Sequence, residues 1–270
     1  MEIRRAVPHP RFRKIVRLFE ERRVDLGSMT VNWPVPARPH QIIDIYLEEP
    51  FRVRVGEGSI RPVPQIVVVG PQTFPRARLS MSGRIHVFNI LFQPAGLNQL
   101  TGVDMRTLVD QDPAASDVLG RSAVRLGNRV RAASDFPARV RATEQWLDGV
   151  MERRTSSNEA INHASALLIT TAGQMRVDEL VELTGMSASQ LQRRFNEQIG
   201  LGPKGYARLI RFDRALVTRR SAPERSWTDI LHDLGYFDQA HFIREFHMFA
   251  GISPTRFSGD WENVFFPGTD

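Results

Sequence analysis

Two stretches of the chain carry nearly the same pattern, GMSASQLQRRFNEQIGLGP at residues 185–203 and GYFDQAHFIREFHMFAGISP at residues 235–254. Both contain the spacing R-x-F-x4-G-x2-P, which begins at Arg193 in the first copy and at Arg244, 51 residues later, in the second. A large apolar residue stands two positions before each arginine. Agreement at five positions indicates an internal repeat, so we expect two copies of one supersecondary unit.

Each copy has the pattern of a helix-turn-helix unit. An amphipathic segment precedes each copy, RVDELVELTG at residues 176–185 and WTDILHDLG at residues 227–235. Each of these segments ends at a glycine, which can take the left-handed conformation that terminates a helix. A capping residue, Ser187 or Asp238, then begins a second helix. A helix, a short glycine turn and a second helix together predict a helix-turn-helix motif.

The second helix of each copy is predicted to have one buried and one exposed face, because its apolar residues recur three and four positions apart. The predicted buried residues are Ala188, Leu191, Phe195 and Ile199 in the first copy, and Phe242, Phe246 and Phe249 in the second. The predicted exposed residues are Ser189, Gln192, Arg193 and Asn196, and Ala240, His241, Arg244 and His247. Glutamine and arginine match the edges of adenine and guanine in the major groove, although any solvated helix face can carry them.

A single helix is predicted between the two copies. The segment PKGYARLIRFDRALVTRRS has one apolar stripe and no glycine after Gly205. A helix of about 17 residues spans about 26 Å. The pitch of duplex DNA is about 34 Å, so the two motifs can enter successive major grooves. Arg208 and Arg211 on this helix are the candidates for phosphate contacts.

The basic residues are almost all arginine, 34 of 36, and only Lys14 and Lys204 are lysines. The planar guanidinium suits phosphates and base edges, but codon usage in a GC-rich genome produces the same excess. Residues 151–270 hold 14 basic against 15 acidic residues, whereas residues 187–220 hold eight against two. We therefore expect phosphate attraction at the first recognition helix and the linker helix, with less affinity from the second motif.

The N-terminal half reads as strands followed by helices. Residues 30–93 contain β-rich runs such as QIIDIYLEE, QIVVVG and RIHVFNILF, and FRVRVGEGS alternates before a glycine turn, so a small antiparallel sheet or barrel is predicted. The first thirty residues are basic and weakly patterned. After Pro94 the apolar spacing becomes helical up to about residue 150. The domain boundary is expected near residue 155, with no strand pattern beyond it.

Chemistry typical of enzymes is missing from the sequence. There is no cysteine, no Gly-x-Ser-x-Gly segment and no phosphate-binding loop, so we expect no enzyme and no cofactor. The best metal pairing is His241 with Glu245, and because two ligands make a poor site, no metal is predicted. His40 with Asp44, and His86, either line a cavity of the barrel or are satisfied polar residues in a sheet. The absence of a secretory or membrane-spanning segment predicts a cytoplasmic protein without a membrane partner.

The C-terminal part resembles the AraC/XylS family of bacterial transcription regulators over about 100 residues, from Asn158 to Phe257. The resemblance is carried by the two R-x-F-x4-G-x2-P copies and by the segments GPKGYARLIRFDRAL and LGYFDQAHFIREF. The resemblance implies two helix-turn-helix units of one monomer in adjacent major grooves. It implies base contacts from Ser189, Gln192, Arg193, Ala240, His241 and Arg244. Polar side chains often occur where Ala240 stands, and alanine offers only apolar contact, for instance to a thymine methyl group.

Family members commonly place a cupin-like β-barrel sensor and dimerisation helices ahead of the DNA-binding domain, and the strands and helices up to residue 150 are similar to that arrangement. We therefore expect an α+β chain of two domains. Residues 1–150 are the expected cupin-like sensor or dimerisation domain with its following helices. Residues 157–258 are the expected all-α domain of about seven helices with two helix-turn-helix motifs.

The expected function is sequence-specific DNA binding that regulates transcription, controlled by a small ligand or by dimerisation through the N-terminal domain. The alternative is a constitutive DNA-binding protein whose barrel serves only for oligomerisation. Expected partners are double-stranded DNA, a small-molecule effector, RNA polymerase and a second copy of the chain. The sequence assigns no residue to effector binding. An enzyme recruited to DNA would need a cysteine acceptor or a metal cluster, and the sequence has neither.

Overall fold

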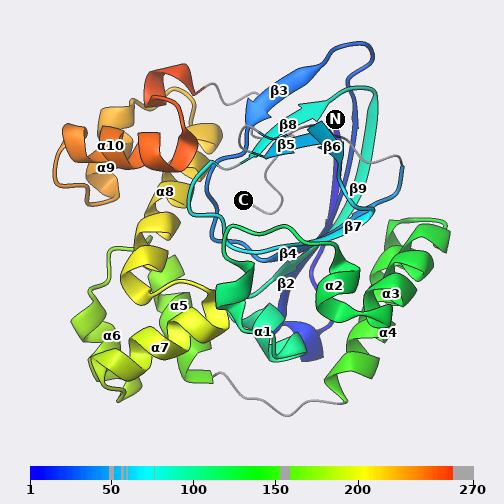
Figure 1. Cartoon of the computed structure of the whole chain (residues 1–270). Helices are drawn as coiled ribbons and strands as arrows, with labels where there is room; N and C mark the ends of the chain where they lie inside the picture. The colour runs from blue at the N-terminus through cyan, green and yellow to red at the C-terminus, as the bar shows by residue number, and fades with distance from the viewer. Residues whose placement is uncertain (49–51, 56–57, 59, 76, 153–158, 258–270) are drawn as a thin grey trace.

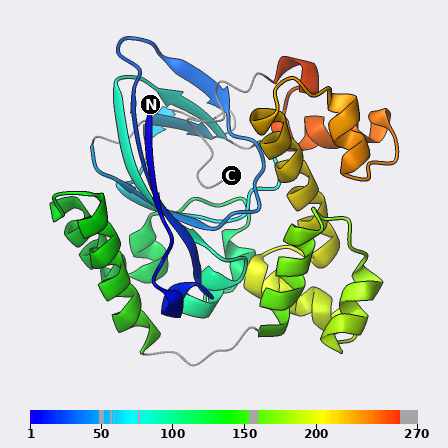
Figure 2. The same cartoon turned by 180° about the vertical axis from the view of Figure 1, so that it is seen from behind.

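A computed structural model describes residues 1–48, 52–55, 58, 60–75, 77–152 and 159–257 of the chain. The N-terminal part forms two antiparallel sheets with helices, and the C-terminal part is helical (Figure 1). This is the expected α+β arrangement. Viewed from either side, the helix pair α3–α4 and the helices α9 and α10 lie at opposite ends of the molecule (Figure 2). The expected domain boundary near residue 155 falls within residues 153–158, outside the described residues.

The larger sheet has the strand order β1-β2-β9-β4-β7, and the smaller one has the order β3-β8-β5-β6. The strands of the larger sheet are β1 (Glu2–Ala6), β2 (Val16–Asp25), β9 (Arg84–Phe92), β4 (Ile42–Tyr46) and β7 (Ile66–Val69). The strands of the smaller sheet are β3 (Val31–Pro34), β8 (Ala77–Met81), β5 (Arg52–Val55) and β6 (Ile60–Pro62). All ladders between these strands are antiparallel, which confirms the predicted antiparallel sheet.

The sheet extends further towards the N-terminus than its pattern indicated. The first thirty residues contain β1 and also β2, a strand of ten residues between β1 and β9. Glu20, Glu21 and Arg22 on β2 are all at most 4% exposed. Glu21 pairs with His86 at 3.1 Å and with Arg139 at 2.9 Å. Because charges are buried only when they are paired, ion pairs across the fold hold this strand, and no apolar alternation marks it.

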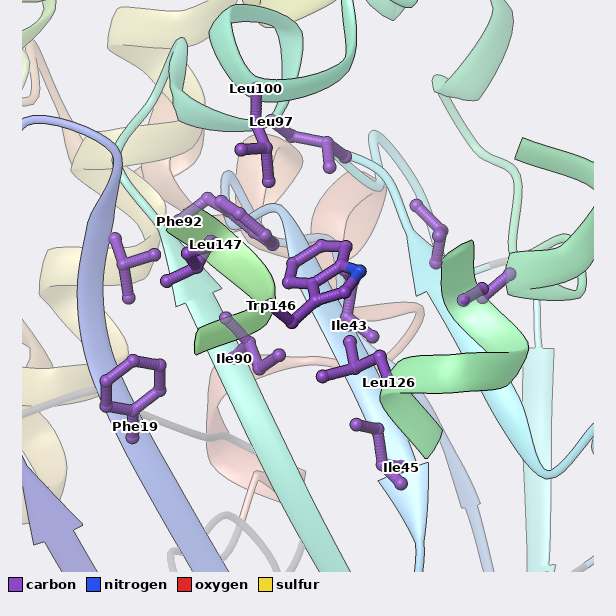
Figure 3. Close-up of a cluster of buried hydrophobic side chains, with 14 of the residues drawn as sticks. Phe19, Ile43, Ile45, Ile90, Phe92, Leu97, Leu100, Leu126, Trp146 and Leu147 are labelled. Carbon is purple, nitrogen blue, oxygen red and sulfur yellow. The ribbon is translucent and has the colours of Figure 1, made fainter. Parts of the chain in front are cut away.

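Helices cover one face of the larger sheet and build the N-terminal core with it. They are α1 (Gly96–Thr101), α2 (Ala115–Leu119), α3 (Arg121–Ala132) and α4 (Phe136–Met151). Figure 3 shows Ile43 and Ile90 of the strands beside Leu126 of α3 and Trp146 and Leu147 of α4. All five are at most 6% exposed, so this core joins the sheet and the helices into one unit.

The C-terminal part contains six α-helices among the described residues 159–257, where about seven helices were expected. They are α5 (Glu159–Thr170), α6 (Val177–Thr184), α7 (Ala188–Ile199), α8 (Pro203–Ser221), α9 (Trp227–Asp233) and α10 (Gln239–Ala250). A 3-10 turn follows at Pro254–Arg256. α8 is the predicted linker helix and has 19 residues. It packs Tyr206 into the core of α5–α7 and Phe212 into the core of α9 and α10.

Candidate DNA interface

The first helix-turn-helix unit consists of α6, a turn and α7. α6 ends at Gly185, whose φ of +64° lies in the left-handed region that glycine adopts without steric strain. α7 begins with a capping box. The backbone N–H of Gln190 donates to the Ser187 hydroxyl at 3.2 Å, and the Gln190 side chain accepts from the Ser187 backbone at 3.1 Å. These two bonds satisfy donors that the first turn of a helix otherwise leaves open.

α7 presents the predicted polar face to solvent. Leu191, Phe195 and Ile199 are fully buried, whereas Ser189, Gln192 and Arg193 are exposed. Ala188, predicted to be buried, is exposed because it is the first residue of the helix and extends beyond the core. Asn196 is half-buried. Arg193 donates to Glu197 at 3.2 Å, an exposed pair one helical turn apart.

The second unit repeats this architecture with α9 and α10. Gly235 has a φ of +66°, and the Asp238 carboxylate caps α10 by accepting from the His241 backbone at 2.6 Å. α10 has 12 residues, as does α7. Ala240 and Arg244 are exposed, as predicted. His241 is half-buried, with its ring against Tyr236, and its Nε2 lies 3.6 Å from Glu245 Oε1.

The two arginines expected at phosphates are both held by other parts of the protein. Arg208 donates through Nε to Glu245 Oε1 at 2.5 Å. Arg211 donates to the carbonyl oxygen of Gly173 at 2.9 Å, and its guanidinium lies over the ring of Tyr236. Each guanidinium is therefore already engaged inside the protein, and the phosphate contacts expected from Arg208 and Arg211 stay predictions.

A cleft of about 920 Å³ separates α10 from the turn between α5 and α6. Arg176, Arg208, Arg211 and Arg244 line it together with Lys204. Lys204 is exposed in the first turn of α8, and sequence reasoning did not assign it a role. Its position directly after the last proline of the first repeat could have indicated that Lys204 lies beside the first recognition helix. The cleft and the exposed faces of α7 and α10 make up the candidate DNA interface.

A short segment of the N-terminal part, residues 37–41, contacts all three helices of this interface, and we call it the strap. The backbone N–H of Ala37 donates to the carbonyl oxygen of Phe249 in α10 at 2.7 Å. The His40 imidazole lies 3.4 Å from Asp213 of α8. The Gln41 side chain donates to the carbonyl oxygen of Ile199, the last residue of α7, at 3.4 Å. The strap therefore joins the C-terminal ends of both recognition helices.

The strap changes the interpretation of the N-terminal histidines. His40 pairs with Asp213 and not with Asp44, which accepts from Asn89 at 2.7 Å. His86 forms a hydrogen bond with Glu21 within the sheet. Of the two interpretations, cavity lining or a satisfied polar residue, the structure therefore favours the second for His86. Within the described residues there is no group of three or more side chains suited to holding a metal. No helix in the same residues is long and apolar enough to cross a membrane.

Comparisons with known proteins agree with this architecture. The protein-family profile described as a helix-turn-helix domain matches residues 180–259. The HTH-type transcriptional regulator MtrA of Neisseria gonorrhoeae is 27% identical over 84 residues, a match that spans 31% of this chain and only 28% of that relative.

Among solved structures, ToxT of Vibrio cholerae O395 has 12% identity and a TM-score of 0.51, covering 92% of this chain and 98% of that chain. ToxT bound to (E)-4-(8-methylnaphthalen-1-yl)but-3-enoic acid has 11% identity and a TM-score of 0.50, covering 92% and 99%. At such identities the likeness shows the fold.

The paired helix-turn-helix units, their linker helix and the N-terminal sheets give the chain a ToxT-like two-part architecture with a helix-turn-helix domain in its C-terminal part. The C-terminal part carries an AraC-type helix-turn-helix domain.

Proposed function

We propose that the chain binds a bipartite DNA site through α7 and α10 and regulates transcription. The observation that carries this proposal is that both helices expose the face predicted from the repeat, with Gln192 and Arg193 on α7 and Arg244 on α10. Ser189, Ala240 and His241 complete the proposed base-contacting set. α8 has 19 residues and so spans about 28 Å, which suits helices that enter successive major grooves about 34 Å apart.

We further propose that residues 1–150 act as a cupin-like sensor or dimerisation domain and residues 157–258 as the DNA-binding domain, in a cytoplasmic protein. The strap supports a link between the two, because it contacts α7, α8 and α10. A change in the N-terminal domain that moves the strap would alter the relative placement of the recognition helices. A second copy of the chain and RNA polymerase remain the proposed protein partners.

We infer that a small organic acid controls the protein from a cavity beside the strap. This cavity has a volume of about 430 Å³ and lies between the larger sheet and α8. Its lining combines the cations Arg5, Arg17 and Arg214 with apolar residues such as Ile169 and Ile210. Cations beside apolar walls suit a carboxylate with a hydrocarbon body, and ligand sites occur preferentially between domains. The ToxT structure with a bound butenoic acid agrees with this ligand class.

The electrostatics of this cavity favour an anion that competes with Asp213. Burial acts to raise the pKa of Asp213, but His40, Arg17 and Arg214 together hold that pKa below its ordinary value. Burial lowers the pKa of Arg17, and Asp213 opposes that effect. A ligand carboxylate would offer the same cations a second anion. Its binding would therefore weaken the bond between the strap and α8.

The first experiment is a selection of bound sites from a random duplex pool, with the wild type, Arg193→Ala and Arg244→Ala. Two short sequence blocks about 10 base pairs apart are expected, and each variant should relax only its own block. One block, lost only in Arg193→Ala, would mean that α10 grips the backbone without reading bases. If no sequence is enriched, the proposed sequence-specific regulation is wrong.

The second experiment measures binding of (E)-4-(8-methylnaphthalen-1-yl)but-3-enoic acid by isothermal titration calorimetry. Arg214→Ala should weaken binding, whereas the control Arg129→Ala, an exposed arginine on α3, should not. Binding that is equal in both variants would exclude the cavity. Absence of binding by this acid and by a series of simple fatty acids would favour the alternative, a constitutive binder whose N-terminal domain serves only for oligomerisation.

A further inference from the structure

Glu245 is a buried charge in the middle of the second recognition helix. It stands between the exposed Arg244 and the buried Phe246, and only 4% of its surface is exposed. An ionised carboxylate is costly to bury without a partner, so the structure must supply one. Its partner is Arg208 of the linker helix, whose Nε lies 2.5 Å from Glu245 Oε1.

The Arg208 guanidinium contacts α10 on one side, and 40% of the Arg208 side chain stays exposed towards the cleft. Besides Glu245, Arg208 approaches Met248 with an Nη2–Sδ distance of 3.8 Å, and its guanidinium carbon lies 5.6 Å from the ring centroid of Phe249. All three contacts are residues of one helix, 37 to 41 positions away in the chain. The arginine is therefore a tie between the linker helix and the second recognition helix.

The repeat shows that this tie belongs to the second unit only. Glu245 directly follows Arg244, and the matching position after Arg193 is Arg194. Arg194 is exposed, whereas Glu245 is buried. The second unit therefore has a buried acidic residue at the position where the first unit has a solvent-exposed cation. This residue does not add to phosphate attraction, and its contact is with α8.

We propose that Arg208 and Glu245 are positioning residues that fix the rotation of α10 on the linker helix and so determine which base pairs Arg244 and His241 reach. Glu245 is next to Arg244 and one helical turn from His241, with its Oε1 3.6 Å from His241 Nε2. A rotation of α10 that breaks the pair would move both base-facing side chains together. This inference rests on the proposed base reading by α10. It replaces the phosphate role expected for Arg208.

The two roles of Arg208 predict different binding behaviour. A phosphate contact contributes equally on every sequence, and its loss lowers the slope of log K against log salt by about one. A positioning residue contributes through the bases read by α10. Its loss leaves the salt dependence unchanged, relaxes the second sequence block, and widens the range of accepted spacings between the blocks.

The test uses the full chain in a selection from a random duplex pool and in salt titrations on the selected site. The variants are Arg208→Gln, Glu245→Gln and the double variant, with Arg208→Lys as the conservative change. Lys204→Gln is the matched control, because Lys204 is exposed on the same helix and lines the same cleft. The thermal unfolding midpoint of each variant is measured in parallel.

Each single substitution at the pair is expected to reduce discrimination in the second block about tenfold, the size of one base-pair contact, and to leave the first block intact. The double variant should be no worse than the single variants, because the residues act as a unit. Arg208→Lys should recover part of the discrimination. Lys204→Gln should weaken binding to all sequences and lower the salt slope by about one.

Three results would overturn the proposal. One is a uniform loss of affinity with a lower salt slope for Arg208→Gln, which identifies a phosphate contact. Another is unchanged discrimination in both single variants. The third is complete loss of the second block with a lowered unfolding midpoint in every variant of the pair, Arg208→Lys included, which identifies a purely structural contact. If the wild type enriches no second block, the proposed base reading by α10 is itself contradicted. The wild-type selection shows this outcome before any variant is compared.

Discussion

Replacing His40 with alanine tests the contact by which the strap holds the linker helix. His40 and Asp213 lie 3.4 Å apart, and their side chains are only 11% and 15% exposed. The substitution removes the imidazole that lies against a carboxylate that stays buried. The cations Arg17 and Arg214 also lower the pKa of Asp213. The loss is therefore partial, because Asp213 keeps two of its three stabilising partners.

The expected magnitude follows from this geometry. Two unit charges 3.4 Å apart attract by about 5 kcal/mol at an effective dielectric constant of about 20, which sets an upper limit when the imidazole is protonated. The cost of desolvating both groups offsets part of this attraction. A hydrogen bond to a charged group contributes about 2 kcal/mol net. The His40–Asp213 distance of 3.4 Å is long for such a bond, so we expect His40→Ala to lower the free energy of unfolding by at most about 2 kcal/mol.

Urea unfolding of the full chain measures this effect, with tryptophan fluorescence as the signal. Trp227 packs on Phe242 and Phe246 and so reports on the second helix-turn-helix unit. The set is His40→Ala, Asp213→Asn and the double variant, with a coupling energy of at least about 1 kcal/mol expected. His163→Ala, at an exposed position of α5, is the control and should change little. Strictly additive costs would refute the argument that His40 acts through Asp213.

Three further predictions concern other parts of the structure. Gly173→Ala should cost about 2 kcal/mol more than Gly185→Ala in urea unfolding. Both residues have positive φ, but a Cβ at position 173 would lie 2.1 Å from a backbone oxygen of α8, whereas a Cβ at position 185 would contact nothing within 4 Å. Equal costs for the two substitutions would contradict this packing. The histidine and arginine partners of Glu21 outweigh its burial and lower its pKa below 4.5. The stability that Glu21 contributes is therefore present above that value and is lost as the pH falls below it. In the wild type the thermal unfolding midpoint should fall between about pH 5 and about pH 3, and in Glu21→Gln this fall should be smaller. Glu197→Gln releases Arg193 from its exposed pair and should raise DNA affinity about threefold in fluorescence anisotropy, whereas unchanged affinity would mean that the pair does not restrain the arginine.

The C-terminal elements were predictable from the sequence because their signals are local. Gly185 and Gly235 both have the positive φ that their place after a helix predicts, and Ser187 and Asp238 both cap the helix that follows. The apolar spacing of each helix fixed its buried face because helical packing has a short period. β2 could not be found in this way. Its buried Glu21 pairs with His86 and Arg139, both more than sixty positions away, and no local pattern encodes such pairing.

In the candidate site, too, features with a local sequence signal were predictable and features that depend on distant partners were not. Exposure of the recognition faces depends on the helix period, so the sequence predicted Gln192, Arg193 and Arg244 correctly as exposed residues. The roles of Arg208 and Arg211 depend on what lies opposite them in the folded chain. Their partners are 37 and 38 residues distant, and a solvated cation and a buried tie look the same in a sequence.

The two helix-turn-helix units use their basic residues differently. We infer that one unit contributes mainly to DNA affinity and the other mainly to the choice of base pairs. In the first unit Arg194 and the adjacent Lys204 are exposed, so their charge is available to DNA phosphates, and Arg193 is exposed beside its partner Glu197. Around the second unit Arg208 bonds to Glu245, and Arg225 bonds to Asp233 at 2.5 Å. Cations engaged in this way stiffen the protein and contribute little to phosphate attraction. The first unit is therefore suited to supplying most of the binding energy. The second unit, held on α8 by the Arg208–Glu245 ion pair and on the N-terminal domain by the strap, is suited to selecting the spacing and sequence of the second half of the site.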